Sequence, residues 1–338
     1  MNGISSQSRI SSWDWLLTGG KGMGAPVHNL ATTRMDSSSK QDSSAQRRHK
    51  RHRLSNVFFK YYFLFSILAL CFVLGLVFIF IGKTALLLFG QISPADFFLS
   101  FNWTPEEDAF GAAAFIVNTL SLTALTLLIA VPISVGMAVL NAEIAPKWMT
   151  SFIRPILDLL VGIPSIVYGY LGLTVLLPFL RRVSGESLGD GLLAAALVLA
   201  LMVLPTITRI SDDAIVAVPR KYRDAAYALG STRLQVISRV VLPAASRGVV
   251  SAVILGMTRA VGETMAVVMV IGNTPQLAKS LFSPTSVLTS NIVMQISNVE
   301  YDSTWNYALH MMAFLLLLIS FVLILVIRIL GRKRRDQA

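Results

Sequence analysis

Charged residues are scarce in this sequence: Asp, Glu, Lys and Arg together make up 14% of its 338 residues. A soluble globular chain carries roughly 25%. Hydrophobic residues make up 54% of the chain, and its mean hydropathy is +0.65. The sequence therefore lacks the polar surface that a water-soluble protein needs, and we predict a membrane protein.

Residues for metal or disulfide chemistry are equally few. Cys71 is the one cysteine, so the chain cannot form an intrachain disulfide. The four histidines lack metal-ligand spacing, and there is no H-E-x-x-H motif. A phosphate-binding loop for ATP is also missing, because Gly82-Lys83-Thr84 matches only the end of its pattern and position 77 is valine. We therefore expect no metal, no cofactor and no catalytic activity here, and ATP hydrolysis, if any, in another subunit.

Long uncharged runs alternate with charged segments. Five runs carry no Asp, Glu, Lys or Arg: residues 61–81, 109–142, 159–180, 191–208 and 303–327. A sixth apolar stretch, 248–278, is interrupted only by Arg259 and Glu263. Because a helix needs about 20 apolar residues to cross a bilayer, we predict an all-α membrane protein with six transmembrane helices. The second run is longer than one span needs, so we expect an amphipathic approach at 110–114 before it.

The distribution of Lys and Arg predicts the orientation in the membrane. The termini and alternate connections (1–57, 143–154, 209–247 and 328–338) carry 23 basic residues, whereas the opposite set (82–111, 181–190 and 272–302) carries four. Basic residues accumulate on the cytoplasmic side, so both termini are predicted to be cytoplasmic. This sorting accounts for the net charge of +11 without any nucleic acid.

The domain organisation follows from these patterns. Residues 1–56 are polar and low in complexity, and we expect a disordered basic cytoplasmic tail that anchors the first helix. A role in binding anionic lipids or in regulation is the alternative. We expect a six-helix transmembrane domain over residues 57–331 and a second basic cytoplasmic tail over 332–338.

The longest internal cytoplasmic connection, about 211–247, contains two short helical patterns. The first starts after Pro219 and stops at Gly230, a typical C-terminal residue. The second covers 232–241 and is expected to end at Pro243. Its predicted apolar face consists of Leu234, Ile237 and Val241.

This connection resembles the EAA loop of ABC-importer permeases. The matching residues are Asp224, Ala225, Ala226, Gly230, Leu242 and Pro243, with Asp in place of the usual Glu. The resemblance implies a type I importer permease fold and a coupling helix that docks into an ATPase subunit. An amphipathic surface helix with no partner is the alternative.

Arg259 and Glu263 lie four residues apart, on one face of the predicted fifth helix. Each charge costs about 2.5–3.5 kcal/mol at the centre of a bilayer, so the pair must face the bundle or a water-filled path. It is either a self-neutralising salt bridge or a pathway site in which Arg259 attracts an oxyanion and Glu263 holds the arginine between substrates. Arg154 and Asp158, which have the same spacing, are interpreted as a structural pair.

The segment around these charges resembles the permeases of phosphate ABC importers. The run 255–267 and its ending Gly-Glu-Thr-Met-Ala-Val at 262–267 are similar to the PstC type of subunit, as are 163–169, 204–206 and 270–273. The resemblance implies that Arg259 and Glu263 line a phosphate path in a bacterial plasma (inner) membrane. It also implies partners: a PstA-like second permease, a PstB-like ATPase dimer, a PstS-like periplasmic or lipid-anchored phosphate-binding protein, and the lipid bilayer.

Several functional assignments stay open at this point. Molybdate, tungstate or sulfate would present similar oxygens to an arginine, and an ion-coupled secondary transporter or a sensory scaffold are further alternatives. Five polar residues within the spans could bind phosphate or a neighbouring helix: Asn118, Ser165, Tyr168, Thr206 and Thr264. The predicted outer loops, 82–111 and 272–302, are candidates for docking a binding protein through Asp96, Glu106, Glu107 and Asp108.

Overall fold

The computed structural model describes residues 59–185 and 189–333. The expectations for the tail 1–56 and for most of the tail 332–338 therefore lie outside the described residues. The chain divides into two units, Met1–Leu74 and Gly75–Ala338. The contacts discussed below all belong to the second unit.

Six helices in the described part of the chain are long and apolar enough to cross a membrane. They comprise Phe59–Gly90, Ala113–Ile144, Ser165–Val183, Leu192–Val216, Arg233–Gly262 and Thr304–Ile329. This number confirms the predicted six-span architecture. The first, third and fifth spans, however, have different bounds from those expected, and the first ends at Gly90 rather than at residue 81.

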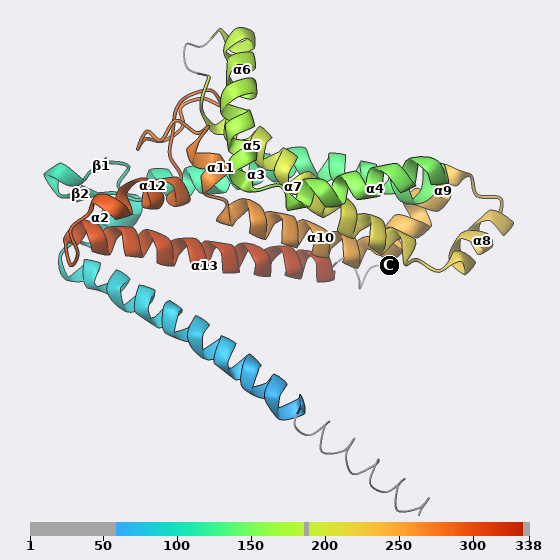
Figure 1. The fold of residues 1–338 in the computed structure, drawn as a ribbon, viewed down its shortest axis with the longest axis horizontal. Helices are drawn as coiled ribbons and strands as arrows, with labels where there is room; N and C mark the ends of the chain where they lie inside the picture. Colours follow the sequence, from blue (N-terminus) through green and yellow to red (C-terminus); the bar gives the residue numbers. More distant parts are fainter. Residues whose placement is uncertain (1–58, 186–188, 334–338) are drawn as a thin grey trace, which may run out of the picture. The chain divides into compact units, whose positions relative to one another are not determined.

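Short elements gather at two opposite ends of the second unit (Figure 1). The hairpin end contains α2 (Pro94–Leu99), α12 (Leu288–Gln295) and an antiparallel pair, β1 (Trp103–Thr104) and β2 (Ala109–Phe110). Two 3₁₀ turns, Pro105–Glu107 and Ile296–Asn298, also lie there, and a third, Leu88–Gly90, ends the first span. The α8 end contains α8 (Arg220–Ala228) and α9 (Arg233–Val236).

Four long helices, α3 (Ala113–Val139), α7 (Leu192–Val216), α10 (Leu242–Gly262) and α13 (Thr304–Lys333), lie between the two ends (Figure 1). The shorter helices are α4 (Lys147–Gly162), α5 (Ser165–Leu171), α6 (Leu177–Ser184) and α11 (Met265–Val268), of which α6 projects away from the bundle (Figure 1). Three π-turns interrupt or extend them: Leu140–Ile144, Gly172–Leu176 and Ile237–Val241. The third span is thus α5, a π-turn and α6 in succession.

Helix α7 is the centre of the core. Helices α3, α4 and α10 pack against it, and α13 lies along α10 (Figure 1). Most residues of α7 are buried, among them the small Ala195, Ala196 and Ala200. Gly256 of α10 approaches α7 so closely that a Cβ there would lie 2.5 Å from Ile207 Cγ1. Small residues therefore allow the central helices to pack in direct contact.

The expected amphipathic approach at 110–114 is wrong. Phe110 lies in strand β2 and pairs with Trp103 of β1, and α3 begins only at Ala113. The Trp103 and Phe110 rings meet edge to face with centroids 5.6 Å apart, and both are buried. Aromatic contacts of this kind favour the hairpin over a surface helix.

The third span begins later than the sequence indicated. Helix α4 ends at Gly162, Ile163 is extended (φ −70°, ψ 129°), and α5 starts after Pro164. A residue before proline is driven out of the helical region, and proline itself has no N–H for a helix interior. The uncharged run 159–180 is therefore divided, and α4 is a separate helix.

The fifth span also differs from the expectation. Pro243 does not end a helix: it lies in the first turn of α10, and the helical path is continuous from Arg233 to Gly262. The π-turn Ile237–Val241 precedes α10 and accommodates the proline at a position where its missing N–H costs little. The predicted apolar face is only partly buried, because Ile237 and Val241 face the core while Leu234 is exposed.

Candidate translocation path and coupling region

Arg259 lies beside the middle of the central helix. Its Nη1 donates a hydrogen bond to Thr206 Oγ1 at 3.1 Å, and Thr206 belongs to the middle third of α7. The arginine side chain is half-buried. No carboxylate lies within 4.0 Å of its guanidinium among residues 59–185 and 189–333. Most of its five N–H donors are therefore available to another acceptor.

The expected pairing of Arg259 with Glu263 on one helical face is wrong. Helix α10 ends at Gly262, and Glu263 is extended (φ −74°, ψ 128°). Its Oε1 accepts a hydrogen bond from the Ala266 backbone N–H at 3.2 Å, and its carbonyl accepts one from Thr289. The helix break thus directs the carboxylate toward α11, and the arginine has no anionic partner among the residues that the structure describes.

The polar residues within the spans fall into two groups. Asn118 is buried and fully used in holding the hairpin end: it donates to Gln276 O, Thr285 Oγ1 and Ser286 O, and accepts from Ala278 N. Tyr168 donates to a carbonyl of the preceding helix, and Thr264 to Gly262 O. Thr206 alone of the five binds Arg259. No hydrogen bond of the Ser165 side chain is found within the described residues.

A charge network joins α4 to α7 near the α8 end, and the sequence analysis missed it. Arg154 forms two hydrogen bonds with Asp212, at 2.9 and 3.2 Å, which raise the pKa of Arg154, and Arg209 contacts Asp158 and Asp213. The expected Arg154–Asp158 pair is therefore replaced by two pairs between helices. The sequence did contain a signal for this network: Arg209, Asp212 and Asp213 follow the uncharged run 191–208 directly and have helical spacing.

The two short helices at the α8 end have one face on the bundle and one face outward. Ala226 is buried in a cluster with Ala138, Ile215 and Val236, whereas Asp224 and Ala225 are exposed. Gly230 ends α8 with φ +79°, a left-handed conformation that glycine adopts without strain. Leu242 is half-buried and Pro243 exposed at the start of α10.

The outward face at the α8 end is unusually apolar. Leu229 is 88% exposed and Leu234 74% exposed, and Tyr222 and Tyr227 are also exposed. Adjacent exposed apolar side chains on a connection between helices are typical of a surface that a partner covers.

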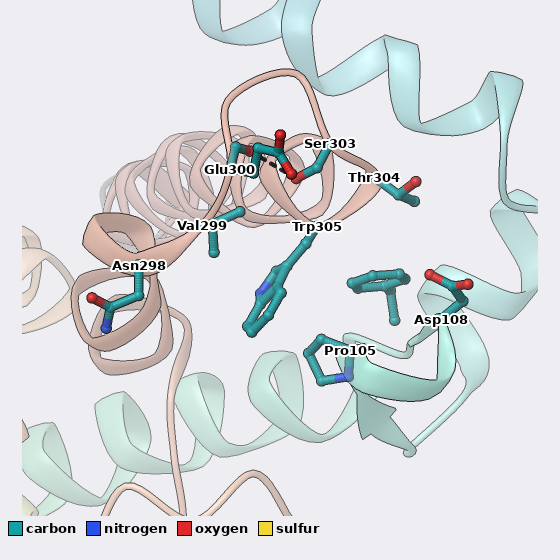
Figure 2. Close-up of a pocket in the computed structure, with 9 residues that line it drawn as sticks. Pro105, Asp108, Asn298, Val299, Glu300, Ser303, Thr304 and Trp305 are labelled. Atoms are coloured by element: carbon teal, nitrogen blue, oxygen red, sulfur yellow. Dashed lines mark hydrogen bonds between the residues drawn. The ribbon is translucent and has the colours of Figure 1, made fainter.

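The hairpin end contains a cavity of about 370 Å³ (Figure 2). Pro105, Asp108 and Phe110 come from the hairpin side of this cavity. The opposite side consists of Asn298, Val299, Glu300, Ser303, Thr304 and Trp305. Aromatic rings and the carboxylates of Asp108 and Glu300 therefore line the same space, next to the loops that were predicted to face outward.

The chain matches a known protein family over most of its length. Residues 130–336 match the model for the binding-protein-dependent transport system inner membrane component. The probable ABC transporter permease protein YqgH of Bacillus subtilis (strain 168) is 43% identical over 261 residues, covering 76% of this chain and 84% of that protein. The phosphate transport system permease protein PstC of Xylella fastidiosa (strain Temecula1) is 35% identical over 268 residues, covering 74% and 81%.

A solved structure shares the fold. The chain resembles a subunit of a bacterial ABC transporter involved in the import of the acidic polysaccharide alginate, with a TM-score of 0.56, 16% identity, and coverage of 83% of this chain and 99% of that one. The protein is therefore a membrane-spanning permease subunit, and the chain belongs to the family of binding-protein-dependent transport system inner membrane components. Within that family it is a permease of the PstC type.

Proposed function

We propose that the chain is the PstC-type half of the translocation path of an ATP-driven importer of inorganic phosphate. The phosphate assignment is supported by the PstC relatives and by the residues around Arg259. The observation that carries it is a guanidinium beside the middle of α7 that has one hydroxyl partner and no carboxylate partner among the described residues. A planar fork of N–H donors suits a tetrahedral oxyanion.

Arg259 and Glu263 are the proposed substrate-path residues. Arg259 binds the anion together with the Thr206 hydroxyl, which lies 3.1 Å from its Nη1. Non-helical backbone at membrane depth is tolerated where it is buried in protein or lines a water-filled cavity, which supports a path beside Glu263 and Thr264. Glu263 is proposed to line the path beside the arginine, with its carboxylate held by the Ala266 N–H so that the guanidinium stays available to the anion.

The coupling loop is proposed to bind the ATPase. Asp224 and Ala225 face outward with the exposed Leu229, while Ala226 anchors α8 in the bundle. Gly230, Leu242 and Pro243 shape the turn and the start of α10 behind it. A PstB-like ATPase dimer would cover this surface, and its motion would move α8 as a rigid helix.

The remaining partners follow from the same proposal. One permease subunit encloses half of a path, so a PstA-like second permease completes it. The excess of Lys and Arg in the connection that contains α8 supports a cytoplasmic α8 end and cytoplasmic termini. The hairpin end then faces outward, where a PstS-like binding protein docks.

The cavity at the hairpin end is the proposed anchor for that binding protein. Its lining combines carboxylates with the Trp305 and Phe110 rings, which suits a Lys or Arg side chain. No Lys or Arg occurs in the sequence between Lys83 and Lys147 or between Lys279 and Arg328. The lining segments therefore carry no cation of their own that would compete for the cavity.

Uptake of labelled phosphate at micromolar supply tests the transport assignment. Cells lacking the chain are complemented with the wild-type gene, Arg259→Gln or Arg247→Gln, the last being an exposed arginine on the same helix. Wild type and Arg247→Gln should restore uptake, whereas Arg259→Gln should assemble with its partners but not transport. Normal uptake by Arg259→Gln would contradict the path assignment.

The same assay separates phosphate from other tetrahedral oxyanions. Excess molybdate, tungstate and sulfate are added as competitors, because each could bind the same guanidinium. Uptake that resists all three supports phosphate as the substrate. Suppression by one of them would reassign the permease to that anion.

A further inference from the structure

A nearly buried ion pair connects the coupling helix to the end of α3. Arg223 of α8 contacts Glu143 in the π-turn Leu140–Ile144: Nη2 lies 2.5 Å and Nε 3.0 Å from Oε1. The side chains are only 15% and 12% exposed. Both N–H groups converge on one carboxylate oxygen, which fixes the direction of the guanidinium.

The same guanidinium also holds the end of α7. Arg223 donates to the carbonyls of Ile215 and Val218, at 3.0 and 2.5 Å. Arg233 of α9 donates to the backbone carbonyl of Glu143. The two short helices at the α8 end are thus joined to α3 and α7 by hydrogen bonds from two arginines.

Few other contacts could hold α8 in place. Its single buried residue is Ala226, and most of its other side chains are exposed. A small apolar contact resists separation but permits sliding, whereas an ion pair with two N–H groups on one carboxylate oxygen and further bonds to carbonyls fixes one geometry. Arg223 is therefore the main polar connection of α8 to the bundle.

A continuous set of contacts leads from this connection to the proposed path. Glu143 ends the span that contains α3. On that helix, Ser134 donates to the Leu204 carbonyl of α7 at 3.2 Å, two residues before the Thr206 that binds Arg259. A displacement of α8 that pulls on Glu143 therefore acts on a rigid helix packed against the arginine's partner.

We infer that the Arg223–Glu143 pair is the mechanical joint that transmits movement of α8 to α3 and α7. The inference rests on the proposed function, in which an ATPase moves α8. The pair acts on transport through positioning, since neither residue touches the proposed substrate path. Its loss should separate ATP hydrolysis from transport while leaving the ATPase docked.

Glu143→Gln in the complete transporter tests this inference. The variant keeps the size of the side chain but removes the charge that Arg223 binds. We expect the ATPase to co-purify as in wild type and to hydrolyse ATP in proteoliposomes, with the phosphate moved per ATP reduced about tenfold, a usual size for coupling between sites. Lys147→Gln, which removes one exposed charge nearby, is the matched control and should keep the wild-type ratio.

A covalent substitute for the pair provides the second readout. Glu143→Cys with Arg223→Cys, in a Cys71→Ser background, is bridged by a short bis-methanethiosulfonate, which forms a reducible disulfide with each thiol and releases methanesulfinate. Bridging should restore the ratio of phosphate moved to ATP hydrolysed, and a reductant should abolish the restored ratio. A pair that served only to stabilise the fold would show no such reversible change. An unchanged ratio in Glu143→Gln, or a bridge that rescues nothing, would overturn the inference.

The experiment also separates this inference from the proposal on which it rests. If the wild-type permease fails to co-purify with an ATPase, the coupling-loop assignment fails. If wild type co-purifies and Glu143→Gln does not, the pair serves docking, and the inference about transmission is wrong.

Discussion

Replacing Asp212 by Asn should destabilise the permease more than any other single loss of charge in the α4–α7 network. The Asp212 side chain is fully buried, and its oxygens accept bonds from Arg154 Nε at 2.9 Å, Arg154 Nη2 at 3.2 Å and Asn141 Nδ2 at 3.1 Å. An amide offers one acceptor oxygen and turns its NH₂ toward a donor. The variant therefore loses its ion pairs with Arg154 and with Arg209, whose Nη1 lies 3.8 Å from Oδ2, and places two donors against each other.

The size of the effect follows from burial. Breaking a buried pair costs about 3–5 kcal/mol. The Arg154 side chain is 37% exposed and regains hydration, so we expect the free energy of unfolding to fall by about 2–3 kcal/mol. This corresponds to roughly a 30- to 150-fold change in the equilibrium between folded and unfolded protein. For a chain of this length the melting temperature should fall by roughly 3–4 °C.

Thermal unfolding of the detergent-purified protein, followed by size-exclusion chromatography, measures this change. Asp213→Asn is the matched control, because Asp213 is the next residue, its side chain is 63% exposed, and its one ion-pair partner in the described part of the chain is Arg209, at 3.4 Å. An exposed pair contributes about 0–1 kcal/mol, so that variant should melt near the wild-type temperature. Equal melting temperatures for Asp212→Asn and Asp213→Asn would refute the argument from burial.

Three further changes have expected outcomes that follow from local geometry. Gly230→Val should reduce co-purification of the ATPase, because valine is strained at φ +79° by about 1–3 kcal/mol, whereas Gly230→Asn should retain it. Gly169→Ala should lower the melting temperature, since its Cβ would lie 2.9 Å from Ala266 Cα; Gly162→Ala, with no atom within 4 Å, should not. Asp108→Lys should weaken binding of the purified substrate-binding protein and reduce the salt dependence of that binding, measured by titration. Unchanged affinity in Asp108→Lys would remove the cavity from the docking surface.

The number of spans could be predicted from the sequence because hydrocarbon imposes a simple length requirement. Uncharged runs such as 303–327 coincide closely with a helix, Thr304–Ile329. The division of 159–180 between α4 and α5 was also visible in principle, since Pro164 disfavours a helical Ile163. The spans were predicted from the absence of charged residues, and this criterion does not detect a backbone break such as the one at Ile163 and Pro164.

The pairing of charged residues could not be obtained from spacing along the chain. Arg154 and Asp158 have the spacing of a helical pair, yet each binds a residue of α7. Tertiary packing offers Arg154 the fully buried carboxylate of Asp212, with which it forms two hydrogen bonds.

The position of Pro243 also depends on its surroundings, because this residue was expected to end a helix and instead lies at the start of one. A preceding π-turn changes the hydrogen-bonding pattern so that proline occupies a first turn.

The helix break after Gly262 has a direct consequence for the charge of the proposed path. In a continuous helix over 248–278, Arg259 and Glu263 would share one face and neutralise each other, and an incoming anion would have to displace the carboxylate. In the observed geometry the Glu263 carboxylate is held by Ala266 N–H, and the one hydrogen-bond partner of the guanidinium within residues 59–185 and 189–333 is the Thr206 hydroxyl. The net positive charge beside α7 therefore depends on where α10 ends, so a variant that extends this helix should weaken transport even with both charged residues present.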